Sequence, residues 1–196
     1  MSDKETISVY DKEAARYASH FKADMVNARL TRFVDRLPKG GSALDLGCGP
    51  GRSAGYMAAR GIIVDALDAS RSMLELVKQY DGVTAILGDF YSIPKNAAYD
   101  GVWANFSLLH ASRDAFPQHL ADIKSSLKEG GYFTIALKLG DGEMRDKIGR
   151  LYTYHSEDGL EAALKTAGFS IIQVDKGRDP GLDGTYSDWI SMDCHA

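Results

Sequence analysis

One stretch decides the fold of this chain: residues 42–52 read SALDLGCGPGR. The apolar residues Ala43, Leu44 and Leu46 predict a buried parallel strand. Glycines at 47, 49 and 51 follow, and a helix is predicted over residues 53–60. Glycine adopts positive φ and lets the backbone come close to a ligand, while the start of a helix offers unpaired N–H groups. A strand, a glycine turn and a helix in this order are typical of a nucleotide-type site.

The spacing of the glycines indicates which nucleotide-type ligand fits. The dinucleotide fingerprint G-x-G-x-x-G places its third glycine three residues after the second. Here that position holds Arg52, and the third glycine comes early, at Gly51. Asp45, at the end of the strand, would repel a pyrophosphate and would pair with an ammonium group. The pattern therefore disfavours a pyrophosphate.

Further strands are predicted along the chain, and most are separated by helices. They cover residues 62–67, 83–87, 99–105, 132–137, 169–174 and 186–194. A helix over residues 114–128, closed by Gly130 and Gly131, and another over residues 156–167 show apolar stripes. No helix separates the last two strands, so they pair as a hairpin and the last strand is antiparallel. We expect an α/β fold with a doubly wound, mostly parallel, seven-stranded sheet.

The two ends of the chain are more polar. Residues 1–9 predict a frayed terminus. Two helices are expected after them, from Asp11 to about His20 with Phe21 on its apolar side, and from about Met25 to Leu37 with Val26 on its stripe. Residues 138–154 are irregular and suit either a substrate-binding lid or an ordinary loop. We expect one domain over residues 1–196, divided into N-terminal helices (1–40), a cofactor-binding core (41–138) and a substrate-side part (139–196).

The D-x-G-x-G-x-G spacing from Asp45 to Gly51 resembles the first motif of the class I S-adenosylmethionine-dependent methyltransferases. The resemblance covers nearly the whole chain, including the strand-end acid Asp68 and the terminal hairpin. It implies a Rossmann-like fold and in-line transfer of a methyl group from S-adenosylmethionine to a small molecule, leaving S-adenosylhomocysteine. Small bacterial methyltransferases of the tellurite-resistance type are similar in size and layout. Residues 105–108 lack the Asn/Asp-Pro-Pro-aromatic tetrad of enzymes that methylate nucleobase amino groups, which disfavours nucleic acid as a substrate.

The resemblance also implies roles for single residues. Asp45 would accept from the ammonium of the cofactor's amino-acid tail, Asp68 would bind the ribose diol, and Asp89 with Phe90 would read the adenine. Tyr10 and Tyr17 are candidates for an aromatic contact from the N-terminal helix, although Tyr17 also fits that helix's buried face. Ser70 is also expected to cap the following helix. For Asp89, a turn or helix cap is the less favoured alternative to the cofactor role. The full set of expected cofactor residues is Tyr17, Asp45, Gly47, Cys48, Gly49, Gly51, Asp68, Ala69, Ser70, Met73, Asp89, Phe90 and Asn105.

His110, after the fourth predicted strand, is the candidate catalytic residue. It would serve as a base where the acceptor must lose a proton, although a helix-cap or packing role is favoured over catalysis for this histidine. The candidates on the substrate side are Tyr10, His110, Lys138, Arg145 and Tyr152. No metal ion is expected.

Composition limits the choice of partners. A net charge of −4 argues against a nucleic-acid-binding surface. The two cysteines, Cys48 and Cys194, lie far apart, and there is no apolar N-terminal run. We therefore expect a cytoplasmic protein without a membrane segment, as a monomer or homodimer. Two alternatives stay open: a nicotinamide-dependent oxidoreductase and a non-catalytic S-adenosylmethionine-binding protein. The oxidoreductase is disfavoured because a dehydrogenase of the Tyr-x-x-x-Lys type needs a lysine four residues after the tyrosine, and the residue four positions after Tyr152 is Ser156.

Overall fold

The computed structural model describes residues 3–20, 28–96 and 98–196. Its main sheet has seven strands in the order β3-β2-β1-β4-β5-β9-β8. The strands are β1 (Ser42–Leu46), β2 (Ile63–Asp68), β3 (Val83–Leu87), β4 (Tyr99–Asn105), β5 (Leu127–Lys138), β8 (Ser170–Pro180) and β9 (Tyr186–His195). Strands β1 to β5 pair in parallel, whereas β9 is antiparallel to both β5 and β8. The expected mostly parallel sheet with an antiparallel last strand is confirmed.

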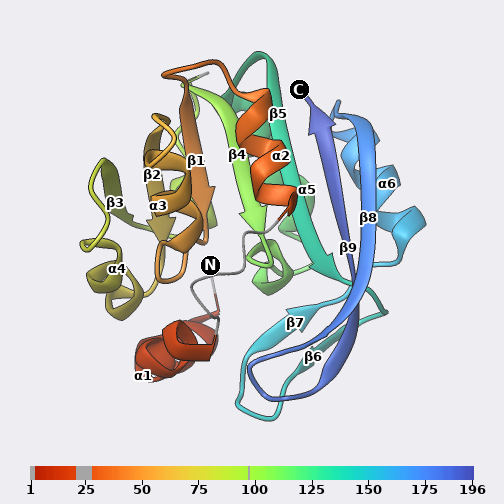
Figure 1. Cartoon of the computed structure of the whole chain (residues 1–196). Coiled ribbons are helices and arrows are strands. Elements are labelled where there is room, and N and C mark those ends of the chain that lie inside the picture. The colour runs from red at the N-terminus through yellow and green to blue at the C-terminus, as the bar shows by residue number, and fades with distance from the viewer. Residues whose placement is uncertain (1–2, 21–27, 97) are drawn as a thin grey trace.

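Helices cover both faces of this sheet (Figure 1). On one side lie α2 (Ala28–Arg36), α3 (Arg52–Ala58) and α4 (Arg71–Val77), and on the other lie α5 (Phe116–Ser126) and α6 (Glu157–Thr166). Side chains alternate between the two sides: on β1, Ala43 packs with α2 and α3, whereas Leu44 and Leu46 pack with α5. The strands are therefore apolar on both faces, as a doubly covered parallel sheet requires.

The carboxyl ends of β1, β2 and β4 point toward α1 (Lys4–His20) (Figure 1). A separate two-stranded hairpin, β6 (Glu143–Arg145) with β7 (Leu151–Thr153), lies at the same edge of the sheet. Two short 3-10 helices, η1 (Phe90–Ser92) and η2 (Leu108–His110), follow β3 and β4. This edge is where ligands bind in open α/β sheets.

Several predicted boundaries were wrong. The prediction of a frayed terminus over residues 1–9 fails because α1 begins at Lys4, where the Asp3 carboxylate accepts the Thr6 N–H at 2.8 Å. Helix α5 ends at Ser126, before the predicted Lys128, because Leu127 already pairs with Tyr99 of β4. Strand β8 runs past Val174 to Pro180 because β9 pairs along its whole length. Phe21 and Val26, and the predicted helix start at Met25, lie outside the described residues.

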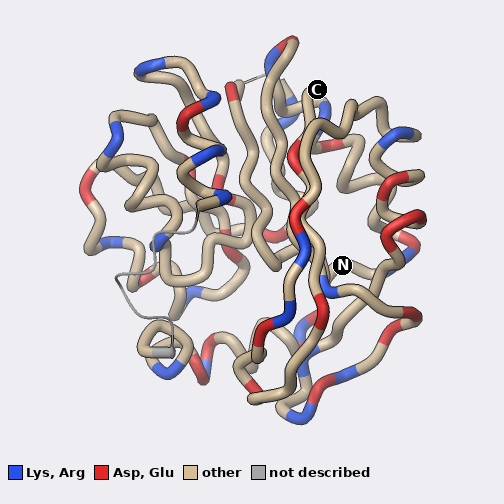
Figure 2. The backbone as a smooth tube through the Cα atoms, turned by 45° about the vertical axis from the view of Figure 1, so that its right-hand side comes forward, with Lys and Arg blue, Asp and Glu red and all other residues tan. Residues whose placement is uncertain are grey.

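Charged residues of both signs are interspersed along the backbone (Figure 2). They alternate on the β8–β9 ribbon, where Arg178 and Asp188 face each other in the register. Within the described ranges, no helix is both long enough and apolar enough to span a membrane.

Candidate functional site

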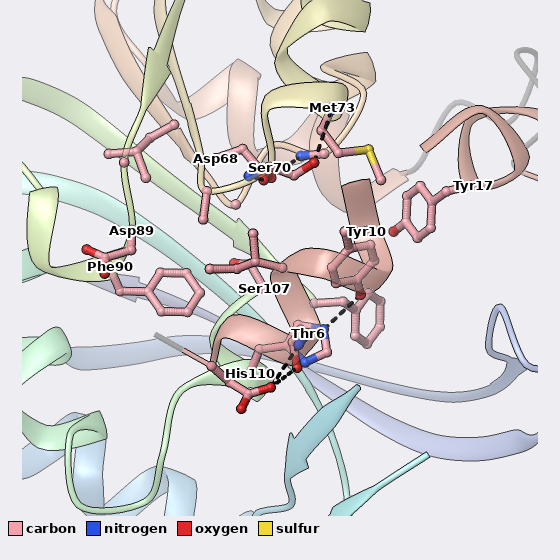
Figure 3. A pocket seen from close by; sticks show the side chains of 18 of the residues that line it. Thr6, Tyr10, Tyr17, Asp68, Ser70, Met73, Asp89, Phe90, Ser107 and His110 are labelled. Carbon is pink, nitrogen blue, oxygen red and sulfur yellow. Dashed lines mark hydrogen bonds between the residues drawn. The ribbon is translucent and has the colours of Figure 1, made fainter. Parts of the chain in front are cut away.

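A cavity lies between the carboxyl ends of β1, β2 and β4 and the inner side of α1 (Figure 3). Its lining joins segments that are distant in sequence: Asp3, Thr6, Ile7, Tyr10 and Tyr17 of the N-terminal segment, Gly47 and Gly49, Leu67 to Ser70, Met73, Gly88 to Phe90, Asn105 to Ser107, and His110. Ten of the thirteen expected cofactor residues are among them. Tyr10 and His110, from the expected substrate side, also line it.

Each of the three glycines in the turn is required for a different structural reason. A Cβ on Gly47 would lie 2.3 Å from Ser107 Cβ, so only glycine lets the β1 and β4 ends approach this closely. Gly49, at φ 53°, would place a Cβ in open space with only Tyr17 Cε1 nearby, at 3.7 Å. Gly51 packs against Val77 of α4 and does not line the cavity. The backbone at Gly49 is therefore the part of the turn that is open to a ligand.

Asp68 connects the end of β2 to the glycine turn. One carboxylate oxygen accepts the Gly49 N–H at 2.8 Å and the other accepts the Ser70 N–H at 2.8 Å. Burial raises the pKa of Asp68, and these backbone hydrogen bonds oppose that rise. A carboxylate oxygen has more than one acceptor site, so Asp68 holds the turn and still presents acceptors to the cavity.

Asp89 and Phe90 form another wall of the cavity. The Asp89 carboxylate caps η1 by accepting the Tyr91 N–H at 3.0 Å, so the structural role expected as an alternative is present. Ser70 likewise caps α4 by accepting the Met73 N–H at 3.2 Å. Both residues also line the cavity, so capping and ligand contact are compatible here.

Buried polar atoms point to a polar ligand. Asn105 Oδ1 and Ser107 Oγ, both on cavity-lining residues, have no hydrogen-bond partner among the described residues. Between them, Phe106 has φ 57°, the one positive value for a non-glycine residue in the described part of the chain. Such strain costs free energy and occurs preferentially at functional sites. The end of β4 therefore offers unsatisfied polar groups on a strained backbone.

Three expected cofactor residues lie behind this lining. Cys48 is buried next to the turn, and Gly51 packs on α4. Asp45 is 3 % exposed; Ala54 donates a backbone hydrogen bond to it, and Asp45 Oδ2 lacks a partner among the described residues. Burial raises the pKa of Asp45 to about 7. Their assignment to cofactor binding stays a prediction.

Three substrate-side candidates also lie outside the lining. Arg145 is exposed on β6 and pairs with Asp3 and Glu5 of the N-terminal segment. Lys138 Nζ lies 4.3 Å from the centre of the Tyr152 ring, and burial lowers the pKa of Lys138. Tyr152 is buried against His110, with ring centroids 4.8 Å apart. Tyr152 thus supports the cavity wall from behind.

Asp3, Thr6, Ile7, Phe106 and Ser107 line the cavity and were not predicted to do so. Asp3 and Thr6 carried a usable signal, because an Asp three residues before a Thr in a polar segment can cap a helix. Phe106 and Ser107 directly follow a predicted strand that was expected to end at the site, and this position alone would have indicated them. Nothing in the sequence indicated Ile7, because residues 1–9 were predicted to be frayed.

The lining fits S-adenosylmethionine in its chemistry. Asn105 Oδ1 and Ser107 Oγ are unused acceptors for an ammonium group, and Asp68 has acceptors for a diol. Asp89 and the Phe90 ring supply an acceptor and an apolar surface for a base. These groups match, in chemical kind, the parts of a ligand that carries an amino-acid tail, a ribose and a purine.

Comparison with known proteins also indicates a methyltransferase. A family model described as "Methyltransferase domain" matches residues 43–131. O-methyltransferase rstn1 of Aspergillus nomiae is 30% identical over 186 residues, which cover 83% of this chain and 81% of that protein. Malonyl-[acyl-carrier protein] O-methyltransferase of Salmonella typhimurium is 30% identical over 126 residues, covering 62% of this chain. The chain spans 46% of the length of that Salmonella relative.

Among solved structures, the 1,6-didemethyltoxoflavin-N1-methyltransferase of Burkholderia thailandensis is similar, with a TM-score of 0.71. The match covers 96% of this chain and 87% of that protein at 24% identity. That structure contains 1,6-didemethyltoxoflavin and S-adenosylhomocysteine. At this identity the similarity shows the fold.

Proposed function

Because this chain belongs to the class I S-adenosylmethionine-dependent methyltransferase family, we propose that it transfers a methyl group from S-adenosylmethionine to a small-molecule acceptor. One observation carries the proposal: the glycine turn, Asp68 and the Asp89–Phe90 pair come from three different strand ends and line a single cavity. These are the parts that a nucleoside with an amino-acid tail requires.

Each part of the lining has a proposed task. Gly47 and Gly49 let the backbone approach the amino-acid tail, and Asn105 and Ser107 accept from its ammonium group. Asp45, whose Oδ2 is unused, adds a negative charge behind the turn. Asp68 binds the ribose diol, and Asp89 and Phe90 bind the adenine. The assignment is supported by the position of these side chains around one cavity.

When bound, S-adenosylmethionine supplies a methyl group made electrophilic by its positively charged sulfur. The chain must then align the acceptor with that methyl group and keep water out. Helix α1 covers the cavity and is attached on two sides. Asp11 accepts from Ser70 Oγ at 2.7 Å next to α4, and Thr6 Oγ1 accepts from the Leu151 N–H at 2.9 Å on β7. We assign the acceptor to the end lined by Tyr10 and His110.

The test is turnover. The purified protein with S-adenosylmethionine and a broad panel of small molecules is expected to release S-adenosylhomocysteine with at least one acceptor. Tight cofactor binding without product for any acceptor would favour the non-catalytic alternative. If the protein quenches NADH fluorescence and does not bind S-adenosylmethionine, the oxidoreductase is favoured. The methyltransferase relatives disfavour that alternative.

The acceptor is proposed only as a small molecule. The similar proteins whose names state a substrate act on chemically different compounds, which include a malonyl-[acyl-carrier protein] and 1,6-didemethyltoxoflavin. Residues of α1 line one side of the cavity and the strand ends line the other, an arrangement that suits a small group better than a duplex nucleic acid.

A further inference from the structure

The Tyr10 hydroxyl joins three parts of the chain at the cavity wall. Its oxygen lies 2.8 Å from His110 Nε2, at the end of η2, and receives a hydrogen bond from Arg150 Nη1 at 2.9 Å, next to β7. Figure 3 shows Tyr10 and His110 facing each other beside the cavity. Tyr10 and His110 line the cavity, whereas Arg150 is 2 % exposed and lies behind Tyr10.

The hydrogen bonds fix where the protons are. His110 Nδ1 lies 2.5 Å from the Leu151 carbonyl oxygen, which can only accept, so Nδ1 carries the proton. In a neutral imidazole the other nitrogen, Nε2, must then accept, so Tyr10 donates its proton to His110. Burial lowers the pKa of His110 to about 4, which agrees with a neutral ring at pH 7.

Arg150 has a guanidinium, which can only donate. Its Nε and Nη2 donate to Asp146 Oδ2 at 2.9 and 2.7 Å, and its backbone N–H donates to Asp146 Oδ1. Asp146 thus holds the side chain so that Nη1 reaches Tyr10. The Tyr10 oxygen then donates once, accepts once and keeps one lone pair. A ligand atom that uses this lone pair must donate a proton.

We propose that Tyr10 takes a proton from the methyl acceptor and passes its own proton to His110, so that the acceptor is a protic nucleophile with an O–H or N–H bond at the methylated atom. This inference rests on the proposed function. Arg150 is a positioning residue, because it does not line the cavity and acts through its hydrogen bond to Tyr10.

The step balances in atoms and charge. The acceptor atom forms its bond to the methyl carbon, and the electron pair of the methyl–sulfur bond stays on sulfur. The acceptor's proton moves to Tyr10 Oη, and the Tyr10 proton moves to His110 Nε2. Positive charge therefore leaves sulfur and appears on the imidazole, so the net charge of the cavity is unchanged. This exchange offsets the cost of charging a buried histidine.

The first test needs no ligand. Nitrogen NMR of the histidine rings is expected to show His110 neutral, with the proton on Nδ1, at pH 7. The charged groups that act on it are Arg150 and Lys138, which lower its pKa, and Asp146, which raises it. Arg150→Met should therefore raise the His110 pKa. His155 is the internal control, since its pKa is also about 4 and it lies outside this network. A proton on Nε2 at pH 7, or a His110 pKa unchanged in Arg150→Met, would overturn the inference.

The second test uses an acceptor found by the turnover panel, which contains matched protic and aprotic nucleophiles. Tyr10→Phe should lower kcat about 100-fold, in the range of a lost acid–base group, and leave the Kd for S-adenosylhomocysteine within about threefold. Arg150→Met should lower kcat and move its pH profile. Methylation of aprotic tertiary amines or thioethers alone, or an unchanged kcat in Tyr10→Phe, contradicts the relay. If no acceptor in the panel gives product, the proposed function is contradicted. The ligand-free NMR still tests the Tyr10–His110 hydrogen bond, because that measurement needs no acceptor.

Discussion

The Asp68 carboxylate accepts a hydrogen bond from the Gly49 backbone N–H at 2.8 Å. This contact ties the end of β2 to the glycine turn after β1, and both partners line the cavity. One carboxylate thus shapes the site and faces the ligand. Substitutions here therefore change both the turn and ligand binding, and matched controls are needed to separate the two.

The close approach at Gly47 predicts a stability difference between two glycines with similar backbones. Gly40 and Gly47 have φ 70° and 69°, but an added Cβ meets nothing at Gly40 and meets Ser107 Cβ at 2.3 Å at Gly47. Gly40→Ala should cost about 1–2 kcal/mol from the positive φ alone. Gly47→Ala should cost a further 1–3 kcal/mol, roughly the penalty of overpacking. Urea unfolding of both variants measures this, and equal losses would show that the contact with Ser107 relaxes freely.

Arg32 predicts a second stability difference. It donates from Nε to Asp193 at 2.7 Å and from Nη2 to Asp175, and it attaches α2 to the sheet. Asp193 is 1 % exposed, and the Thr134 hydroxyl, which donates to its Oδ1 at 2.8 Å, is neutral and does not replace the charge of Arg32. Arg32→Ala should cost about 3 kcal/mol, since it leaves a buried charge unpaired.

The matched control for Arg32 is Arg178, whose partner Asp188 lies 3.8 Å away with both side chains exposed. Arg178→Ala should stay within about 0.5 kcal/mol. If the two variants lose the same stability in urea, then Arg32 does not anchor α2.

Asp45 predicts a pH dependence of stability. Burial raises its pKa to about 7 in the folded protein, above the value of about 4 for an unfolded aspartate. Between these values the folded state binds the proton and the unfolded state does not. The contribution of Asp45 to stability is therefore largest below about pH 4 and is lost as the pH rises toward 7. Subtracting the urea-derived stability of Asp45→Asn from that of wild type at each pH isolates this contribution, and a flat difference from pH 4 to 7 would refute the shift.

Binding should couple to the same group. An ammonium near Asp45 favours the ionised carboxylate, so S-adenosylmethionine binding at pH 6 should release protons. Calorimetry in buffers with different ionisation enthalpies measures the number released. Asp45→Asn should abolish the release. An equal release in that variant would mean that another group titrates.

The sequence was sufficient for the sheet, and the reason is local. Ala43 on one face and Leu44 and Leu46 on the other are apolar and lead into glycines, so the strand and its turn are encoded in one stretch. The strand-end position of Asp68 followed from the next apolar run. The antiparallel β9 followed from the missing helix between the last two strands. These are properties of neighbouring residues, which a sequence displays directly.

What the sequence could not provide depends on distant contacts. The first turn of α1 is polar, and its helix is stabilised by Arg145 and Leu151, more than 100 residues away. The β6–β7 hairpin is too short to show a period, with three residues in each strand. Side-chain direction was also hidden: His110 and Tyr152 are both near the site, but only His110 lines the cavity. The assignment of the lining residues to parts of the cofactor stays a prediction.

Calorimetric titration with S-adenosylmethionine tests the central claim most directly, using wild type, Asp68→Ala and Asp65→Ala. Asp65 lies on the same strand and also accepts a hydrogen bond, from the Tyr99 hydroxyl at 2.6 Å, but does not line the cavity. We expect micromolar binding to wild type and Asp65→Ala, and loss of binding in Asp68→Ala while its thermal unfolding stays cooperative. Absence of binding to the folded wild type, or equal binding to all three proteins, would contradict the assignment of this cavity to S-adenosylmethionine.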